Sequence, residues 1–247
     1  MDTKKQNIRQ SFNKGSAVYN QYNIVQQQAA EYLVSLSDIN LLKFRDVLLD
    51  LGCGNGSISE KILSIYEPKN YIGIDIADQS LEQISGNIVK ICADIDNLPI
   101  ISGSSNIIFS NMALQWLNNY DKVLSDMYDL LGKDGVLIFS IPVDGSFYSI
   151  NNIYAGLFNK LPDEDLIKYF LKEKNFNILK SETKIYTTQF NSCFDALQSI
   201  KSLGAGVNLR NNNGVVLSRR ALRIVDEYFQ GKKIPLDYKI FYVIAQK

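Results

Sequence analysis

The stretch Val47-Leu48-Leu49-Asp50-Leu51-Gly52-Cys53-Gly54-Asn55-Gly56 decides the fold of this chain. An apolar run enters a glycine-rich turn here, and a helical pattern over 57–65 follows it. Glycine adopts positive φ angles and lets a ligand approach the backbone closely. The start of a helix offers free N–H groups and the positive end of its dipole. The pattern therefore predicts a strand, a turn and a helix that together bind the polar part of a nucleotide-like cofactor.

The spacing of the glycines indicates the kind of cofactor. A dinucleotide fingerprint requires Gly-x-Gly-x-x-Gly, whereas Gly52, Gly54 and Gly56 alternate. Asp50 ends the strand before the turn, where a carboxylate suits a ligand with an ammonium group better than a pyrophosphate. Asp75 ends a second apolar strand and is placed to accept hydrogen bonds from both hydroxyls of a ribose. The residues alone leave an ordinary strand-turn-helix corner open as the alternative.

The composition limits the possible functions. The 247 residues are 46% apolar, and 26 Lys and Arg balance 26 Asp and Glu, so the chain predicts one α/β domain and no nucleic-acid partner. The chain has no histidine and no Cys-x-x-Cys pair, so we expect no histidine base and no metal site. Three separated cysteines and the lack of a membrane-length apolar stretch predict a cytoplasmic protein without a membrane partner.

Strands and helices alternate along the chain, which predicts a mainly parallel sheet with right-handed crossovers. Residues 1–16 are polar and are expected to be loosely ordered. The strands are expected at 47–51, 71–75, 87–92, 106–111, 136–141, 176–190 and 239–245, with a turn at 132–135. The helices are expected at 19–36, 57–65, from 78 with Asp78 as N-cap, and at 120–131, 146–159, 162–171, 192–203 and 219–229.

The run Asp-x-Gly-x-Gly-x-Gly followed by a strand that ends in Asp resembles the class I S-adenosylmethionine (SAM)-dependent methyltransferases. This resemblance implies a Rossmann-like α/β fold, with a seven-stranded, mainly parallel sheet, an antiparallel last strand and helices on both faces. It implies SAM as cofactor and S-adenosylhomocysteine as product. The cofactor-binding residues that it implies are Asp50, Gly52, Cys53, Gly54, Gly56, Asp75, Ile76, Ala93, Asp94, Ile95, Asn111, Met112 and Leu114.

Asp94 and the segment 110–116 each have an alternative interpretation. The resemblance makes Asp94, just past the third strand, an acceptor for the adenine amino group, and a helix or turn cap is the alternative. The segment 110–116 leaves the fourth strand toward the cofactor, where Trp116 either shields the ligand or packs in the core. This segment contains no proline. It therefore differs from the Asn/Asp-Pro-Pro-Tyr/Phe turn of amino-methylating DNA enzymes.

The ends of the chain resemble a narrower family, the malonyl-[acyl-carrier protein] O-methyltransferases of biotin synthesis. The resemblance is carried by 12–20 with Val25-Gln26, 201–206, 217–220 and 234–238. It implies a single methyltransferase domain over 1–247. An N-terminal helical lid is expected at about 8–37, and helical excursions after the fifth strand at about 144–172 and 192–232. Residues 144–159 carry no Lys or Arg, so the counter-charge of the malonyl carboxylate stays unassigned.

This resemblance implies methyl transfer to the free carboxylate of a malonyl group on an acyl-carrier protein. A free carboxylate titrates near ~4 and is already ionised, so the transfer needs positioning and exclusion of water but no general base. Tyr19 and Tyr22 are the positioning candidates, with helix-face packing as the alternative. The candidates for contacting the acidic carrier or the carboxylate are Lys201, Arg210, Arg219 and Arg220, with a solvated helix face as the alternative. Two other functions stay open: another small-molecule methyltransferase, such as one acting on carbon of a quinone precursor, and a non-catalytic SAM-binding protein.

Overall fold

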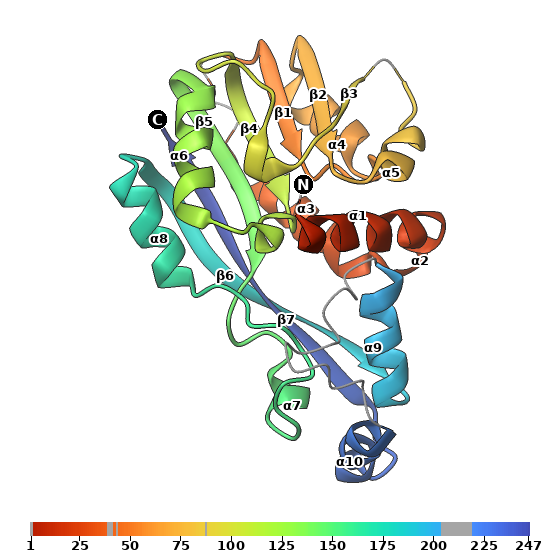
Figure 1. Ribbon diagram of the computed structural model, residues 1–247. Coiled ribbons are helices and arrows are strands. Elements are labelled where there is room, and N and C mark those ends of the chain that lie inside the picture. Colours follow the sequence, from red (N-terminus) through yellow and green to blue (C-terminus); the bar gives the residue numbers. More distant parts are fainter. Residues whose placement is uncertain (1, 39–41, 43, 87, 204–218) are drawn as a thin grey trace.

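The strands form one seven-stranded sheet in the order β3-β2-β1-β4-β5-β7-β6 (Figure 1). The computed structural model describes residues 2–38, 42, 44–86, 88–203 and 219–247. Strands β1 to β5 pair in parallel, whereas β7 runs antiparallel to both β5 and β6. This arrangement confirms the predicted fold class. The strands are β1 (Val47–Leu51), β2 (Asn70–Asp75), β3 (Val89–Cys92), β4 (Ser105–Asn111), β5 (Leu131–Pro142), β6 (Asn177–Phe190) and β7 (Ile234–Gln246).

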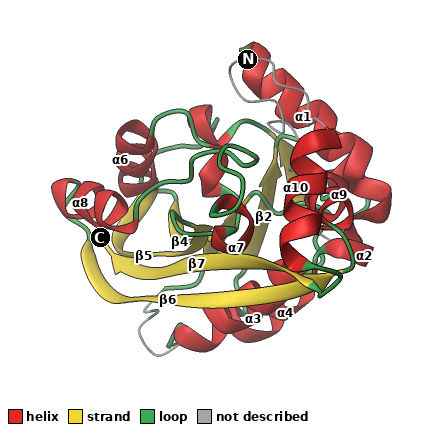
Figure 2. Ribbon diagram, turned by 90° about the horizontal axis from the view of Figure 1, so that it is seen from below, coloured by secondary structure: helices red, strands yellow, loops and turns green. Residues whose placement is uncertain are grey.

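Helices cover both faces of the sheet. In Figure 2, α3 and α4 lie on one side of the strands, and α6 and α8 lie on the other. No helix in the described ranges is long and apolar enough to span a membrane. The α-helices are α1 (Thr3–Gly15), α2 (Tyr19–Tyr22), α3 (Ile24–Leu36), α4 (Ser59–Tyr66), α5 (Asp78–Glu82), α6 (Tyr120–Leu130), α7 (Tyr148–Asn151), α8 (Glu164–Glu173), α9 (Cys193–Ser202) and α10 (Arg219–Phe229).

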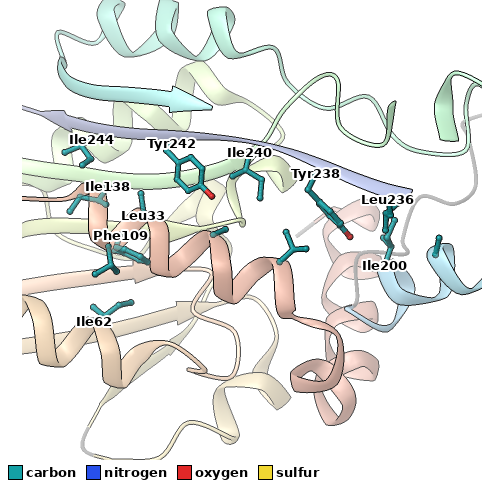
Figure 3. Close-up of a cluster of buried hydrophobic side chains, with 14 of the residues drawn as sticks. Leu33, Ile62, Phe109, Ile138, Ile200, Leu236, Tyr238, Ile240, Tyr242 and Ile244 are labelled. Atoms are coloured by element: carbon teal, nitrogen blue, oxygen red, sulfur yellow. The ribbon is translucent and has the colours of Figure 1, made fainter. Parts of the chain in front are cut away.

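The central strands are apolar in sequence because both of their faces are buried. Successive side chains of a strand point to opposite faces, so Leu48 and Leu49 are both fully buried but join different clusters. Leu48 belongs to the cluster with Leu33, Phe109 and Tyr242, which fills the space between α3 and the sheet (Figure 3). Leu49 belongs to the cluster under α6. This double burial fixes the carboxyl ends of the parallel strands, where the predicted site lies.

The hairpin of β6 and β7 extends beyond the rest of the sheet. Strand β5 pairs with β7 only from Val136 to Pro142, the latter opposite Ile240, while β6 pairs with β7 as far as Ile234. Figure 1 shows the extended part running down to α9 and α10. Helix α9 packs on this hairpin and also contacts α2 and α10. The extension therefore places α9 beside α2, which belongs to the N-terminal helices.

The N-terminal segment is helical, so the prediction of a loose segment at 1–16 was wrong. Asp2 is the N-cap of α1, and its carboxylate accepts from the backbone N–H of Lys5 at 2.8 Å. The polar side chains of α1 find partners on other elements: Lys5 on Asp94, and Arg9 on Asp78. The composition alone predicts that the polar side chains of α1 are solvated. It cannot indicate their partners, which lie far away in the sequence.

Two expected helices differ from the prediction. The helix expected at 19–36 is divided into α2 and α3 at Asn23, which is 1% exposed and has φ −83° and ψ 24°. The helix expected from 78 begins there, but Ala77 is its N-cap and makes no side-chain cap. The carboxylate of Asp78 instead accepts from Arg9 and Asn13. Tertiary partners outside the segment thus override the local capping preference.

Two boundaries after β4 also differ. The turn expected at 132–135 lies inside β5, where Asp134 has φ 61° and the register with β4 shifts between Ser105 and Ile107. The positive φ of Asp134 and the register shift mark an irregularity within the strand and not its end. The aromatic-rich segment 146–159 forms only the short helix α7, so the long helix expected there was wrong.

Candidate cofactor site

The glycine turn between β1 and α4 forms the floor of the site. Gly52, Gly54 and Gly56 have φ angles of 75°, 57° and 73°, which favour glycine. A Cβ on Gly52 would lie 2.2 Å from the Cβ of Ala113, whereas a Cβ on Gly54 would have no atom within 4 Å. Gly52 is therefore required for close packing, and Gly54 borders open space where a ligand can approach the backbone.

Asp75, at the carboxyl end of β2, holds this turn in place. Its Oδ2 accepts from the N–H of Gly54 at 2.9 Å, and its Oδ1 accepts from the N–H of Ala77 at 2.8 Å. Burial raises the pKa of the Asp75 carboxyl, while these N–H groups act in the opposite direction. Each carboxylate oxygen keeps a second lone pair. Asp75 can therefore hold the glycine turn and accept ribose hydroxyls at the same time.

A cavity lies between the glycine turn, the strand ends and α1. It contains about 760 Å³ of space between atoms, its open mouth included, which lies within the range of about 300–1,000 Å³ of small-molecule sites. Helix α1 lies across this edge of the sheet (Figure 1). The predicted residues that line it are Tyr19, Gly52, Gly54, Asp75, Ile76, Asp94, Ile95, Asn111 and Met112.

Helix α1 is fastened over the cavity by ion pairs at two places. Lys5 is 3% exposed, and its Nζ lies 2.9 Å from Asp94 Oδ1 and 2.6 Å from Asp96 Oδ2. One turn further on, the guanidinium of Arg9 lies 3.0 Å from Asp78 on α5. The Lys5 cluster is buried and hydrogen-bonded, as a buried charge requires. The Arg9 pair is partly exposed and contributes less.

Asp94 adopts the cap geometry and also faces the cavity. Its Oδ1 accepts from the N–H of Asp96 at 3.1 Å, so the cap alternative is confirmed. Among the described residues, Asp94 Oδ2 has no hydrogen-bond partner, and Asp94 lines the cavity. Lys5 and the cap therefore fix the orientation of the carboxylate while leaving one oxygen for a donor. Its role toward the adenine amino group stays a prediction.

Aromatic rings close one wall of the cavity. The ring of Trp116 packs edge-on against Phe12 of α1, with centroids 5.6 Å apart and an interplanar angle of 87°. Both rings line the cavity, so Trp116 packs against a neighbour and also shields the space. Met112, which leaves β4 beside it, has φ 50°, an uncommon angle for a residue with a side chain.

A smaller cavity of about 350 Å³ shares Tyr19, Gly52 and Asn111 with the larger one. Asp50 lines it and is 3% exposed. Burial raises the pKa of Asp50 to about 7; a hydrogen bond from the Tyr71 hydroxyl opposes the shift, and the nearby Asp75 charge adds to it. A cation beside Asp50 would stabilise its charged form. The smaller cavity therefore suits an ammonium group.

We expect the affinity for SAM to fall as the pH drops below about 7, the pKa of Asp50. Below that pH the free protein holds a proton on Asp50, and a bound ammonium group lowers this pKa, so binding must release the proton. The affinity should fall by up to about tenfold per pH unit until the pKa of the bound state is reached. Calorimetry from pH 8 to 5.5 measures this slope. The Asp50→Asn variant should bind more weakly with a flatter profile, and equal slopes would show that Asp50 does not titrate in binding.

Most of the remaining predicted residues lie outside both cavities. Leu114 is 2% exposed and belongs to the core, and Gly56 shapes the turn. Ala93 donates its N–H to the Asp75 carbonyl at 2.9 Å. Tyr22 is 39% exposed at the end of α2. Cys53 lines the smaller cavity, Lys201, Arg219 and Arg220 are exposed on α9 and α10, and Arg210 lies outside the described residues.

The structure adds residues that the sequence reasoning missed. Lys5, Ile8 and Phe12 come from α1, and Gln26 from α3. Ile8 and Phe12 are four residues apart, which places them on one face of a helix. That spacing is the signal that could have identified α1 as a wall of the site. The remaining missed residues are Asn55, Ser57, Ile58, Ser80, Ala113 and Leu117.

Comparison with known proteins agrees with this geometry. Residues 49–139 match a family model described as a methyltransferase domain. The chain is 27% identical over 257 residues to the malonyl-[acyl-carrier protein] O-methyltransferase of Marinomonas sp. (strain MWYL1), covering 98% of this chain and 94% of that protein. It is 29% identical over 219 residues to malonyl-[acyl-carrier protein] O-methyltransferase 2 of Coxiella burnetii, covering 85% and 86%. A SAM-dependent methyltransferase of Archaeoglobus fulgidus shares the fold, with TM-score 0.52, 19% identity and coverage of 92% and 94%.

The residues around the two cavities fit SAM. Open space beside Gly54 admits a ligand to the backbone, Asp75 and Asp94 keep acceptor capacity at the larger cavity, and Asp50 lines the smaller one. The arrangement of parallel strands and the matched domain agree with the same cofactor. The chain therefore has the fold of the class I SAM-dependent methyltransferases and fits their cofactor, and residues 49–139 match the methyltransferase domain.

Proposed function

We propose that this chain transfers the methyl group of SAM to the free carboxylate of a malonyl group on an acyl-carrier protein. The product would be the malonyl methyl ester that starts synthesis of the biotin precursor. The observation that carries the proposal is the near full-length similarity to relatives of that name, which covers 98% of this chain in one case. The similarity extends beyond residues 49–139, the part matched by the general methyltransferase domain.

The residues of the site suit an acceptor that is already ionised. SAM, when bound, supplies an electrophilic methyl group and a neutral sulfur leaving group. The chain has no histidine to serve as a base, and a carboxylate needs none at neutral pH because it titrates near ~4. Tyr19 lines both cavities and is the positioning candidate. Burial, with the charge of Asp75, raises the pKa of its phenol, so Tyr19 stays a neutral hydrogen-bond donor.

Exposed cations on α9 and α10 support a binding surface for the acidic carrier protein. Lys201 on α9, and Arg219 and Arg220 on α10, are exposed. Helix α9 contacts both α10 and α2, and Figure 1 shows it close to the N-terminal helices. Exposed cations act mainly on the encounter with an acidic partner and are screened over ~8–10 Å at physiological salt. This position would bring a carrier-bound malonyl group to the side where Tyr19 lies.

The test is an assay with SAM and malonyl-carrier protein. We expect a methyl ester that mild base hydrolyses to methanol, and no methyl transfer to butyryl-carrier protein, which lacks the free carboxylate. A base-stable methyl product would contradict the proposal and favour methylation at carbon, as in the quinone-precursor enzymes. SAM binding without transfer to malonyl-carrier protein would also contradict it, and would leave the non-catalytic alternative in place.

A further inference from the structure

Buried side-chain oxygens without donors occur at both cavities. Within the described part of the chain, Asn55 Oδ1 at the larger cavity and Gln26 Oε1 at the smaller one have no hydrogen-bond partner. A buried acceptor without a donor destabilises the protein. Both positions therefore favour a ligand that carries N–H or O–H groups.

Gln26 is held at the smaller cavity by its backbone. Its carbonyl oxygen accepts from Nδ2 of Asn111 at 3.0 Å, and Oδ1 of Asn111 accepts from the Ser140 hydroxyl at 2.7 Å. These bonds tie the first turn of α3 to the ends of β4 and β5. The side-chain amide takes no part in this anchoring. The place of Gln26 at the cavity is thus set by the fold, and its side-chain oxygen has no donor within the described part of the chain.

Asp50 offers a second acceptor to the same cavity. Its Oδ2 accepts from the Tyr71 hydroxyl, which also bonds to the Ser59 hydroxyl at 2.9 Å. Its Oδ1 has no partner among the residues that the structure describes. A carboxylate from the end of β1 and an amide from α3 thus line one small space. An ammonium group brings three N–H donors and one positive charge, and it needs acceptors for those donors when it is buried.

We propose that Gln26 accepts a hydrogen bond from the ammonium group of SAM and, with Asp50, forms the recognition site for the amino-acid end of the cofactor. Asp50 provides the counter-charge, and the Gln26 amide provides a neutral acceptor from the helix that covers the cavity. This contact involves the cofactor alone. It is therefore independent of whether the acceptor is a malonyl carboxylate.

The test compares two ligands that differ at this end only. S-adenosylhomocysteine carries the amino-acid group, whereas 5′-methylthioadenosine lacks it, and both are neutral at sulfur. Methionine has nearly the length of glutamine and is a good helix former, so Gln26→Met should fold. We expect this variant to bind S-adenosylhomocysteine about tenfold or more weakly, as loss of a hydrogen bond to a charged group predicts, and to bind 5′-methylthioadenosine as the wild type does.

The neighbouring glutamine supplies a matched control. Gln27 lies on the same helix but is exposed, so Gln27→Met should change neither affinity. Gln26→Glu keeps an acceptor and should preserve the preference for S-adenosylhomocysteine over 5′-methylthioadenosine. This variant therefore tests the proposed hydrogen bond even if Gln26→Met does not fold. An equal loss for both ligands in Gln26→Met would show that Gln26 supports α3 only. No loss for either ligand, or a reduced preference in folded Gln26→Glu, would also overturn the proposal.

Discussion

Replacing Gly54 with valine is expected to abolish SAM binding and to leave the fold intact. A Cβ at this position meets no atom of the protein within 4 Å, so the new side chain would occupy the cavity where the cofactor approaches the turn. The φ angle of 57° adds strain, which costs about 1–2 kcal/mol for a residue with a side chain. For a chain of this size that strain lowers the melting temperature by roughly 2–8 °C. Calorimetry with SAM and thermal unfolding without it measure the two effects.

Two other glycines separate the possible causes. Gly103 has φ 71° and open space around its Cβ position, but it lies outside the cofactor cavities, so Gly103→Val should show the strain alone. Gly52→Val should instead prevent folding, because its Cβ would lie 2.2 Å from the Cβ of Ala113. If Gly54→Val unfolds as readily as Gly52→Val, Gly54 is required by the fold and the argument for ligand approach fails.

Replacing Asp75 with alanine is expected to weaken SAM binding by about a hundredfold or more. Two hydrogen bonds from ribose hydroxyls to a carboxylate would be lost, each worth ~1.5–3 kcal/mol, and about 1.4 kcal/mol corresponds to tenfold in affinity. The variant should also be less stable, because the N–H groups of Gly54 and Ala77 lose their acceptor. Titration calorimetry and thermal unfolding report the two losses separately.

A ribose analogue distinguishes direct contact from support of the turn. The wild type should prefer S-adenosylhomocysteine over its 2′,3′-dideoxy analogue, and Asp75→Ala should lose that preference. Asp78→Ala removes a nearby carboxylate that contacts Arg9 and Asn13 of α1, so it should keep the preference. If Asp75→Ala still discriminates as strongly as the wild type, the carboxylate only supports the glycine turn.

Much of the site could be predicted, because local sequence patterns specify its glycine turn and the acids at the ends of its strands. The acids Asp50 and Asp75 each end a buried strand, and the carboxyl ends of parallel strands meet at one edge of the sheet. The alternating glycines come directly after the first of these strands. Local patterns of this kind predict the site correctly because the core on both faces of the sheet fixes the positions of the strand ends.

The resemblance implies an N-terminal helical lid, but the contacts that hold α1 over the site could not be predicted, because they join distant segments. Lys5 is 89 residues away from Asp94, its ion-pair partner, and its sequence neighbours are polar. Gln26, Gln27 and Gln28 are alike in sequence, and the packing of α3, which begins after the break at Asn23, places Gln26 at the cavity. The raised pKa of Asp50 likewise follows from burial, which no motif encodes.

The Lys5 and Arg9 ion pairs, which hold α1 over the cavity, differ in their response to ionic strength. The side chains of the Lys5 cluster are largely buried, whereas those of Arg9 and Asp78 are 39% and 43% exposed. Dissolved ions screen exposed charges much more than buried ones. We therefore expect higher ionic strength to weaken the Arg9–Asp78 contact more than the Lys5 cluster, so that α1 would move about Lys5. The rate at which the cofactor leaves the cavity would then rise with the salt concentration.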